Sequence, residues 1–477
     1  MPRLKRTNEA PHVGIVHLGV GAFCRAHLAQ YTDQAIRHSG GNWGILGISL
    51  RSARTRDALA EQGYAYTAVA LGPNDTTHRQ IEVFRDILVA TENPGAILER
   101  MADPAVKIVS LTITEKGYCL DTSVGGLDWS HPDIQHDLEH PLPVSAPGFL
   151  VCALALRRKR GLPPFTTMSC DNLPENGRCL CQIVLDLARR IDPGLADWVA
   201  EHGRFPNTMV DRITPATTPE DKAMVEALIG ARDEAPVLHE PFSQWVIEDD
   251  FVKGERPDWG RVGAELVSNV APYEAMKLRM LNGTHSALAY LGYLAGNRTI
   301  AETVECPDFR SFVERLWQSE IIPTLSAPEG VSLTDYATKL MARYRNPNVQ
   351  HQTWQIAMDG SQKLPQRILS TLEDRIALGA DSPGLILTLA AWMRYVRGTD
   401  EAGASIDVRD PHAARFSDIA RSTPDHDDWV ASILACQDIF PGNIAHYLQG
   451  RLPAVYRDLC MHGARALVAD YEMSVTA

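Results

Sequence analysis

The feature that most constrains the fold of this 477-residue chain is a short apolar run that ends at two glycines. The run Val13–Leu18 precedes Gly19-Val20-Gly21, and the segment Ala22–Arg37 then repeats apolar side chains at helical spacing. An apolar run of this length predicts a strand buried on both faces, as in a parallel sheet. The segment therefore predicts a strand, a tight turn and a helix in succession.

Three further apolar runs follow at the spacing of strand–helix–strand units: Trp43–Leu50, Val106–Ile113 and Phe165–Cys170. Such alternation predicts a doubly wound α/β sheet. From about residue 271 the pattern becomes helical, with expected helices at Tyr273–Ala295, Phe309–Trp317, Leu333–Tyr344, Gly384–Tyr395, Trp429–Ile439 and Ala454–Tyr471. We therefore predict two domains, an α/β Rossmann-like domain over residues 1–270 and a mostly α-helical domain over residues 271–477.

The glycine turn matches the first part of the dinucleotide fingerprint G-x-G-x-x-G. Gly19 permits the tight turn, and Gly21 lets backbone N–H groups approach a pyrophosphate. We predict that the cofactor contacts Gly19, Val20, Gly21, Ala22 and Phe23. Cys24 stands where the third glycine would be, so an ordinary strand-to-helix turn is the alternative.

Arginines occupy the place where the ribose of the cofactor is usually recognised. In NAD-binding folds an acidic residue lies about 20 residues beyond the glycines. Between Gly40 and Arg56 there is no Asp or Glu, but Arg51 and Arg54 are present. Arginines at this place can bind the 2′-phosphate of NADP. The alternative is that both belong to a solvated start of a helix.

Residues 272–285 carry the strongest concentration of chemically active side chains. At about 100° per residue, Glu274, Lys277, Asn282 and His285 fall within one arc of roughly 140° on a helix. A desolvated lysine can act as a general base, and an asparagine amide can stabilise a developing alkoxide. The alternative is a helix end with a hydrogen-bonded histidine and a lysine that extends into water.

Charge and cysteine content limit the partners. Lys and Arg number 46 against 59 Asp and Glu, a net charge of −13, whereas nucleic acids and anionic membranes bind basic surfaces. No apolar run approaches the roughly 20 residues of a membrane span, and no signal peptide is visible. Nine cysteines without framework spacing indicate reduced thiols and a cytoplasmic protein. Because Cys170, Cys179 and Cys181 fit no common zinc spacing, we expect no metal.

Seven motifs in one order resemble the mannitol dehydrogenase family, the polyol-specific long-chain dehydrogenases. They are IVHLGVGAFCRAH from Ile15, SLTITEKGYC from Ser110, MSCDNLPENG from Met168, MVDRITP from Met209, PFSQWVIEDDFV from Pro241, KLRMLNGTHS from Lys277 and DGSQKLPQR from Asp359. The resemblance implies a Rossmann-like domain that binds NAD, a helical domain that closes over the sugar chain, and a reaction without metal. Members of the mannitol type tend to carry acidic residues after Leu-Arg-Ser, whereas Ala53 and Arg54 follow here, so NADP remains possible.

The family pattern K-x-x-x-x-N-x-x-H falls on Lys277, Asn282 and His285. The resemblance implies that Lys277 is the general base that takes the hydroxyl proton. It assigns Asn282, together with Asn172, to an oxyanion hole, and His285 to orienting the substrate. Glu274 resembles a carboxylate that relays protons to the lysine.

The motifs KLRMLNG, TWQIAMDGSQKLPQR and RGTDEAGASIDVRDP resemble the fructuronate reductases (D-mannonate oxidoreductases) more than the mannitol 2-dehydrogenases. Asp211 and Lys363 resemble residues that contact the substrate, and Lys363 and Arg367 are the cations expected to bind a sugar-acid carboxylate. The alternatives are a mannitol 2-dehydrogenase or another hexitol or pentitol dehydrogenase, and, as a non-enzyme, a nicotinamide-binding sensor. We expect a small-molecule substrate and a monomer or small homo-oligomer.

Overall fold

A computed structural model describes residues 1–121 and 125–474 of the chain. The chain divides into two compact units, Met1–Ala271 and Pro272–Ala477. We describe each unit by itself. Among the described residues, no helix combines the length and the apolar character that a bilayer span requires.

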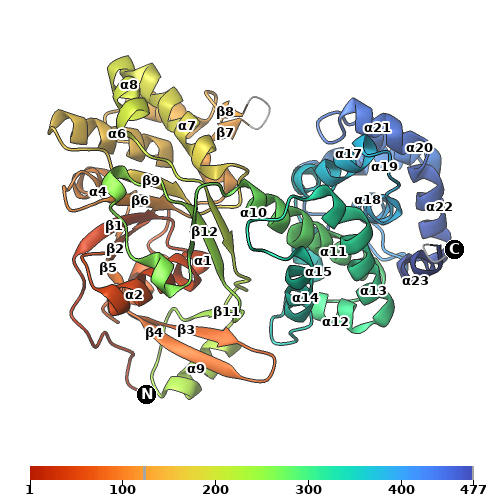
Figure 1. Ribbon diagram of the computed structural model, residues 1–477, viewed down its shortest axis with the longest axis horizontal. Coiled ribbons are helices and arrows are strands. Elements are labelled where there is room, and N and C mark those ends of the chain that lie inside the picture. The colour runs from red at the N-terminus through yellow and green to blue at the C-terminus, as the bar shows by residue number, and fades with distance from the viewer. Residues whose placement is uncertain (122–124, 475–477) are drawn as a thin grey trace. The chain divides into compact units, whose positions relative to one another are not determined.

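The N-terminal unit contains the predicted parallel sheet, with strand order β5-β2-β1-β6-β9 (Figure 1). Its strands are β1 (Val13–Leu18), β2 (Gly44–Ser49), β5 (Phe84–Val89), β6 (Ile108–Leu111) and β9 (Thr166–Ser169). All four pairings are parallel. The predicted doubly wound α/β fold is therefore confirmed, and β5 is a strand that the sequence pattern did not indicate.

Alternate residues of β1 face the two covered sides of the sheet, which is why its side chains other than that of His17 are apolar. Val16 and Leu18 pack in the core beneath α4 (Pro94–Met101), α6 (Ala146–Lys159) and α7 (Asn176–Ile191), which lie together on one face (Figure 1). Ile15 packs in the core on the opposite face, which includes residues of α2 (Leu28–Ser39).

Besides the two-stranded sheet of β7 (Leu120–Asp121) and β8 (Gly126–Leu127), the described residues of the N-terminal unit form two three-stranded sheets, and the sequence pattern predicted none of the three. One has the order β11-β3-β4 and the other β10-β12-β13. Their strands are β3 (Tyr66–Leu71), β4 (Thr76–Ile81), β10 (Thr208–Asp211), β11 (Val237–His239), β12 (Gln244–Glu248) and β13 (Glu265–Val267). Trp245 of β12 packs against Trp259, with ring centroids 4.6 Å apart, and both rings are fully buried.

The prediction of one helix over Ala22–Arg37 is wrong. The segment forms α1 (Ala22–Ala26) and α2 (Leu28–Ser39), which are separated at His27, whose φ of −124° and ψ of −91° are not helical. The buried ring of His27 contacts the rings of Phe23, Tyr31 and Trp245. Tertiary packing around one imidazole thus coincides with the break, although the apolar spacing continues through it.

The C-terminal unit is helical, as predicted, and its described residues form no strand. Helices here include α10 (Ala271–Met276), α11 (Thr284–Leu294), α13 (Pro307–Arg315), α14 (Leu333–Tyr344), α16 (Gly360–Leu364), α18 (Pro383–Val396), α20 (His426–Leu434), α22 (Leu452–His462) and α23 (Ala464–Ser474). The last predicted helix is divided at Gly463, whose φ of 82° is a positive value that glycine adopts readily.

Candidate active site

The glycine turn follows β1 in the N-terminal unit and has the geometry that the fingerprint requires. Gly19 has a φ of 96°, and a side chain there would collide with the carbonyl oxygen of Thr112. A Cβ at Gly21 would meet nothing within 4 Å, which leaves room beside the backbone. The turn therefore fits a pyrophosphate, and Ala22 and Phe23 begin the helix that follows.

A chain of buried hydrogen bonds connects this turn to side chains of β1 and β6. The Thr112 hydroxyl donates to the Gly19 carbonyl at 2.8 Å, so its oxygen accepts from Nε2 of His17 at 2.9 Å. Nδ1 of His17 then accepts from the Ser110 hydroxyl at 2.8 Å. Complete burial lowers the pKa of His17 to about 4, which keeps the ring in this neutral form.

Val20 fits against β2 because Gly47 has no side chain. A Cβ at Gly47 would lie 2.6 Å from a methyl group of Val20, which is 5% exposed. The turn after β1 therefore packs directly against the neighbouring strand β2.

Arg51 and Arg54 lie just beyond the carboxyl end of β2, the strand next to β1. Both are exposed, and the Arg51 side chain lies 3.9 Å from the Asp133 carboxylate, a distant ion pair. Their place after the second strand is the one from which a cofactor ribose is bound in doubly wound sheets. Both arginines therefore lie at a position from which they could bind a 2′-phosphate.

Asn172 follows β9, and the neighbouring Asp171 fixes this loop. The Asp171 carboxylate accepts hydrogen bonds from the backbone of Ile113 at 2.8 Å and Thr114 at 3.0 Å, and from the Tyr118 hydroxyl at 2.7 Å. Burial is the main reason that the pKa of Asp171 is raised. These bonds join the loops after β6 and β9 and so restrain the segment that carries Asn172.

Asp211, the other predicted site residue of this unit, ends β10. It is 4% exposed and pairs with Gln244 across the antiparallel strands. It therefore belongs to the smaller sheet β10-β12-β13, which the sequence did not predict.

In the C-terminal unit, the regular α-helix predicted over Tyr273–Ala295 is wrong between Lys277 and Gly283. This segment is a π-helix, η4, between α10 and α11. Its hydrogen bonds join residues five apart rather than four. Lys277 and Asn282 are five apart, so the wider turn brings them closer to one line along the helix than an α-helix would.

The carbonyl groups of the π-helix are bonded from outside it. The indole N–H of Trp317 donates to the Met280 carbonyl at 3.0 Å, and the Tyr344 hydroxyl donates to the Leu281 carbonyl at 2.9 Å. The Thr284 hydroxyl also donates to the Met280 carbonyl, at 2.5 Å. Because buried carbonyls require donors, these side chains stabilise the irregular turn.

The predicted catalytic side chains of this unit differ in burial. Lys277 is 5% and His285 7% exposed, whereas Glu274 and Asn282 are half-buried. Burial lowers the pKa of His285 well below its usual range, and nearby positive charges lower it further. His285 is therefore a neutral imidazole at neutral pH, able to donate one hydrogen bond and accept another.

Lys363 and Arg367 lie near His285. Both contribute positive charge to the lowered pKa of His285, and the Arg367 guanidinium donates to the Ser286 hydroxyl at 3.3 Å. The π-helix packs directly on this segment, because a Cβ at Gly283 would lie only 2.8 Å from the Arg367 carbonyl oxygen.

Sequence reasoning missed two residues of this group, Arg343 and His351. Both act on the pKa of His285, and the His351 ring lies 4.5 Å from that of His285. Arg343 lies in the last turn of α14, and His351 lies in the segment after this helix. Neither stands at a spacing that connects it to His285, so only the tertiary fold reveals the group.

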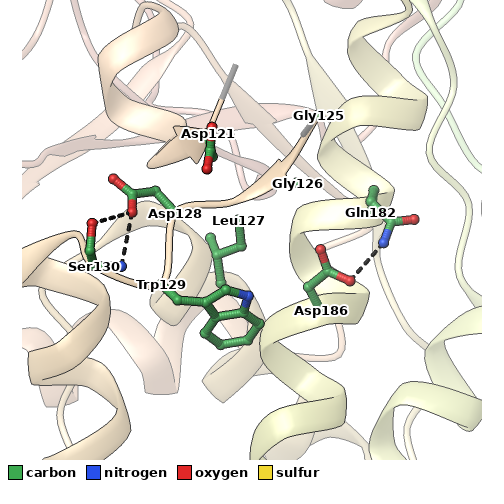
Figure 2. Close-up of a pocket in the computed structure, with 9 residues that line it drawn as sticks. All are labelled: Asp121, Gly125, Gly126, Leu127, Asp128, Trp129, Ser130, Gln182 and Asp186. Carbon is green, nitrogen blue, oxygen red and sulfur yellow. Dashed lines mark hydrogen bonds between the residues drawn. The ribbon is translucent and has the colours of Figure 1, made fainter. Parts of the chain in front are cut away.

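The N-terminal unit also contains a hollow of about 700 Å³ (Figure 2). It lies beside β7 (Leu120–Asp121), β8 (Gly126–Leu127) and α7. Its acidic groups serve local structure, since Asp128 accepts from Ser130 and Asp186 from Gln182. No predicted site residue lines the described part of this hollow, and we assign it no role in the chemistry.

The described residues contain no group of three or more His, Cys, Asp or Glu side chains arranged to hold a metal ion. All nine cysteines are free. Burial raises the pKa values of the Cys170, Cys179 and Cys181 thiols, which disfavours the thiolates that zinc binds.

Two family models match the chain and together span most of it. The model described as the mannitol dehydrogenase Rossmann domain matches residues 13–261. The model described as the mannitol dehydrogenase C-terminal domain matches residues 269–453.

Individual relatives agree with these models. D-mannonate oxidoreductase of Escherichia coli (strain K12) is 47% identical over 462 residues, 95% of each chain. Mannitol 2-dehydrogenase of Phaeosphaeria nodorum is 39% identical over 97% of this chain and 82% of the relative. The solved ternary complex of Pseudomonas fluorescens mannitol 2-dehydrogenase with NAD and D-mannitol superposes with a TM-score of 0.89 at 38% identity, covering 99% of this chain and 96% of that one.

Proposed function

Because the chain belongs to the mannitol dehydrogenase family, we propose that it is an NAD-dependent oxidoreductase that interconverts D-fructuronate and D-mannonate. The observation that carries the choice of a sugar acid is the group of cations around His285, which includes Lys363 and Arg367. Positively charged side chains gathered near one neutral imidazole favour a substrate that carries a carboxylate over one that carries only hydroxyl groups. The higher identity to the relative named for D-mannonate supports the same choice.

In the proposed reaction Lys277 takes the proton of the substrate hydroxyl as the carbon–hydrogen bond breaks. Lys277 is 5% exposed, and the proposed role requires its amine to be neutral before it accepts the proton. A bound NAD would supply the acceptor for the hydride of the same carbon, so that the alcohol would become a ketone. Glu274, half-buried one turn before the lysine, is proposed to pass the proton on to water.

Asn172 and Asn282 are proposed as the two amide donors to the developing alkoxide. Donors held in place before the reaction stabilise charge without the cost of reorganising solvent. Asp171 and the π-helix, respectively, restrain the two backbone segments. We propose that these amides stabilise the alkoxide oxygen, a role that zinc has in other alcohol dehydrogenases, and that no metal takes part.

His285 is proposed to orient the substrate, and Asp211 to contact its hydroxyl groups. Gly19, Gly21 and the residues between and after them are proposed to bind the pyrophosphate. With Arg51 and Arg54 exposed at the end of β2, we propose that NADP is also used, less well than NAD.

We propose a small-molecule substrate, no nucleic-acid or membrane partner, a monomer or small homo-oligomer, and a cytoplasmic location in which the nine thiols stay reduced.

A spectrophotometric panel tests this proposal. D-fructuronate, D-tagaturonate, D-fructose and D-xylulose are each mixed with the protein and NADH or NADPH, and the loss of reduced nicotinamide is followed. The fastest oxidation is expected with D-fructuronate and NADH. Fastest turnover of D-fructose would instead identify a mannitol 2-dehydrogenase, and no turnover of any ketose would favour a nicotinamide-binding sensor.

A further inference from the structure

Two buried imidazole rings, those of His285 and His351, meet edge to face in the C-terminal unit. Their centroids are 4.5 Å apart and their planes are inclined at 79°. Nε2 of His285 and Nδ1 of His351 are buried, and neither has a hydrogen-bond partner within residues 1–121 and 125–474. Because buried polar atoms are normally bonded, the two nitrogens indicate a ligand that completes their hydrogen bonds.

Three basic side chains from different elements act on both rings. They are Arg343 of α14, Lys363 of α16 and Arg367 of the π-helix η7 (Pro365–Leu369). After burial, which is the larger cause, their charges help to lower the pKa of His351 to about 4. Both rings are therefore neutral beside three cations, and the ligand that suits this surrounding is an anion.

The geometry of α14 and η7 holds two of these cations close to the histidines. Tyr344, next to Arg343, lies with its ring 5.2 Å from that of His285 and donates to the Leu281 carbonyl. Arg343 itself is 9% exposed. Arg367 donates to Ser286, the neighbour of His285, at 3.3 Å.

We infer that Arg343, Arg367 and His351 form the subsite for the substrate carboxylate and determine the preference for a sugar acid over a neutral ketose. The inference rests on the proposed function and adds Arg343 and His351 to it. A planar guanidinium matches the two oxygens of a carboxylate, and Nδ1–H of His351 donates a further hydrogen bond. These groups are all hydrogen-bond donors. A sugar hydroxyl also has a proton to donate and finds no acceptor among them, so it fits the subsite less well than a carboxylate.

The test compares kcat/KM for D-fructuronate and D-fructose in the wild type, Arg343→Lys and His351→Gln. Arg343→Lys keeps the positive charge but loses the planar guanidinium. His351→Gln keeps an N–H donor but changes the position from which it donates. The ratio of the two kcat/KM values is expected to fall about ten- to a hundredfold in each variant, the loss of one charge-assisted hydrogen bond. Lys339→Gln, an exposed cation on the same helix α14, is the matched control and should leave the ratio unchanged.

Equal losses on both ketoses, or no loss, would overturn the inference. D-fructose 6-phosphate is a third substrate, and its preference over D-fructuronate by the wild type would make the subsite a phosphate site. Thermal unfolding of each variant shows whether it is folded, and if Arg343→Lys is not, His351→Gln decides.

Calorimetric binding of D-mannonate and D-mannitol separates this inference from the proposed function. A wild type that does not reduce D-fructuronate contradicts the proposed function. The subsite is still supported if D-mannonate binds that wild type and His351→Gln weakens the binding at least tenfold. Absence of D-mannonate binding overturns both proposals.

Discussion

Tyr344→Phe tests whether side chains outside the π-helix hold the catalytic segment in place. The variant removes one hydroxyl, which donates to the Leu281 carbonyl at 2.9 Å and lies 2.8 Å from the Thr284 hydroxyl. Tyr344 is 2% exposed, so no solvent replaces the lost donor. The Leu281 carbonyl keeps its hydrogen bond from the Thr284 backbone N–H, so the variant loses one hydrogen bond, and we expect the free energy of unfolding to fall by about 0.5–1.5 kcal/mol.

The same variant should slow the reaction, because Asn282 directly follows the carbonyl that loses the tyrosine donor. Small displacements of a catalytic group cost up to about 10²-fold in rate, and we expect kcat to fall by about ten- to a hundredfold. Urea unfolding followed by tryptophan fluorescence measures the stability, since Trp317 stacks on Tyr344 with centroids 6.2 Å apart. Tyr293→Phe, on α11 beyond the π-helix, is the control. Unchanged stability and unchanged kcat in Tyr344→Phe would refute the argument.

Three further predictions concern the chemistry. Lys277→Ala should lose about 10²–10⁴-fold in kcat and keep NADH binding, measured by fluorescence titration; near-normal turnover would remove Lys277 from its role. Activity should survive exhaustive EDTA treatment, because amide groups rather than a metal stabilise the alkoxide; loss on chelation with rescue by zinc would show a metal centre. Both NADH and NADPH should be used, NADH with the higher kcat/KM, and Arg54→Ala should lower only NADPH use; strict NADPH dependence would reverse the assignment.

Four of the five strands of the central sheet were predicted from the sequence. β1, β2 and β6 are buried on both faces and mainly apolar, whereas β9 is buried but mostly polar and was predicted through the flanking Phe165 and Cys170. β4 was not predicted because it is an exposed polar strand, TTHRQI, that forms by pairing with β3. β11 and β13 have three residues each, too few to establish a period.

Helical regions were predicted well, but their irregularities were not. The break at His27 and the π-helix at Lys277–Gly283 both occur within continuous apolar spacing. Each is accompanied by contacts with segments distant in the chain, such as Trp245 at His27 and Tyr344 at the π-helix. A periodicity argument contains no information about such contacts.

In the candidate site, too, local spacing predicted some groupings, and contacts between distant segments determine the others. Residues within one turn or one helix, such as Gly19 with Gly21 or Lys277 with His285, are grouped by local spacing and by the resemblance. Arg343 and His351 reach His285 only because α14 packs beside α11 through Tyr344 and Thr284. Charge alone does not identify them, since the chain has 46 lysines and arginines.

The ratio of kcat/KM for D-fructuronate to that for D-fructose, both with NADH, tests the central claim most directly. A carboxylate bound by a charge-assisted hydrogen bond gives about 1.5–3 kcal/mol, so the wild-type ratio should be about ten to a hundred or more. Arg367→Ala should bring the ratio close to one. A wild type that reduces D-fructose with the higher kcat/KM would contradict the assignment of a sugar-acid substrate.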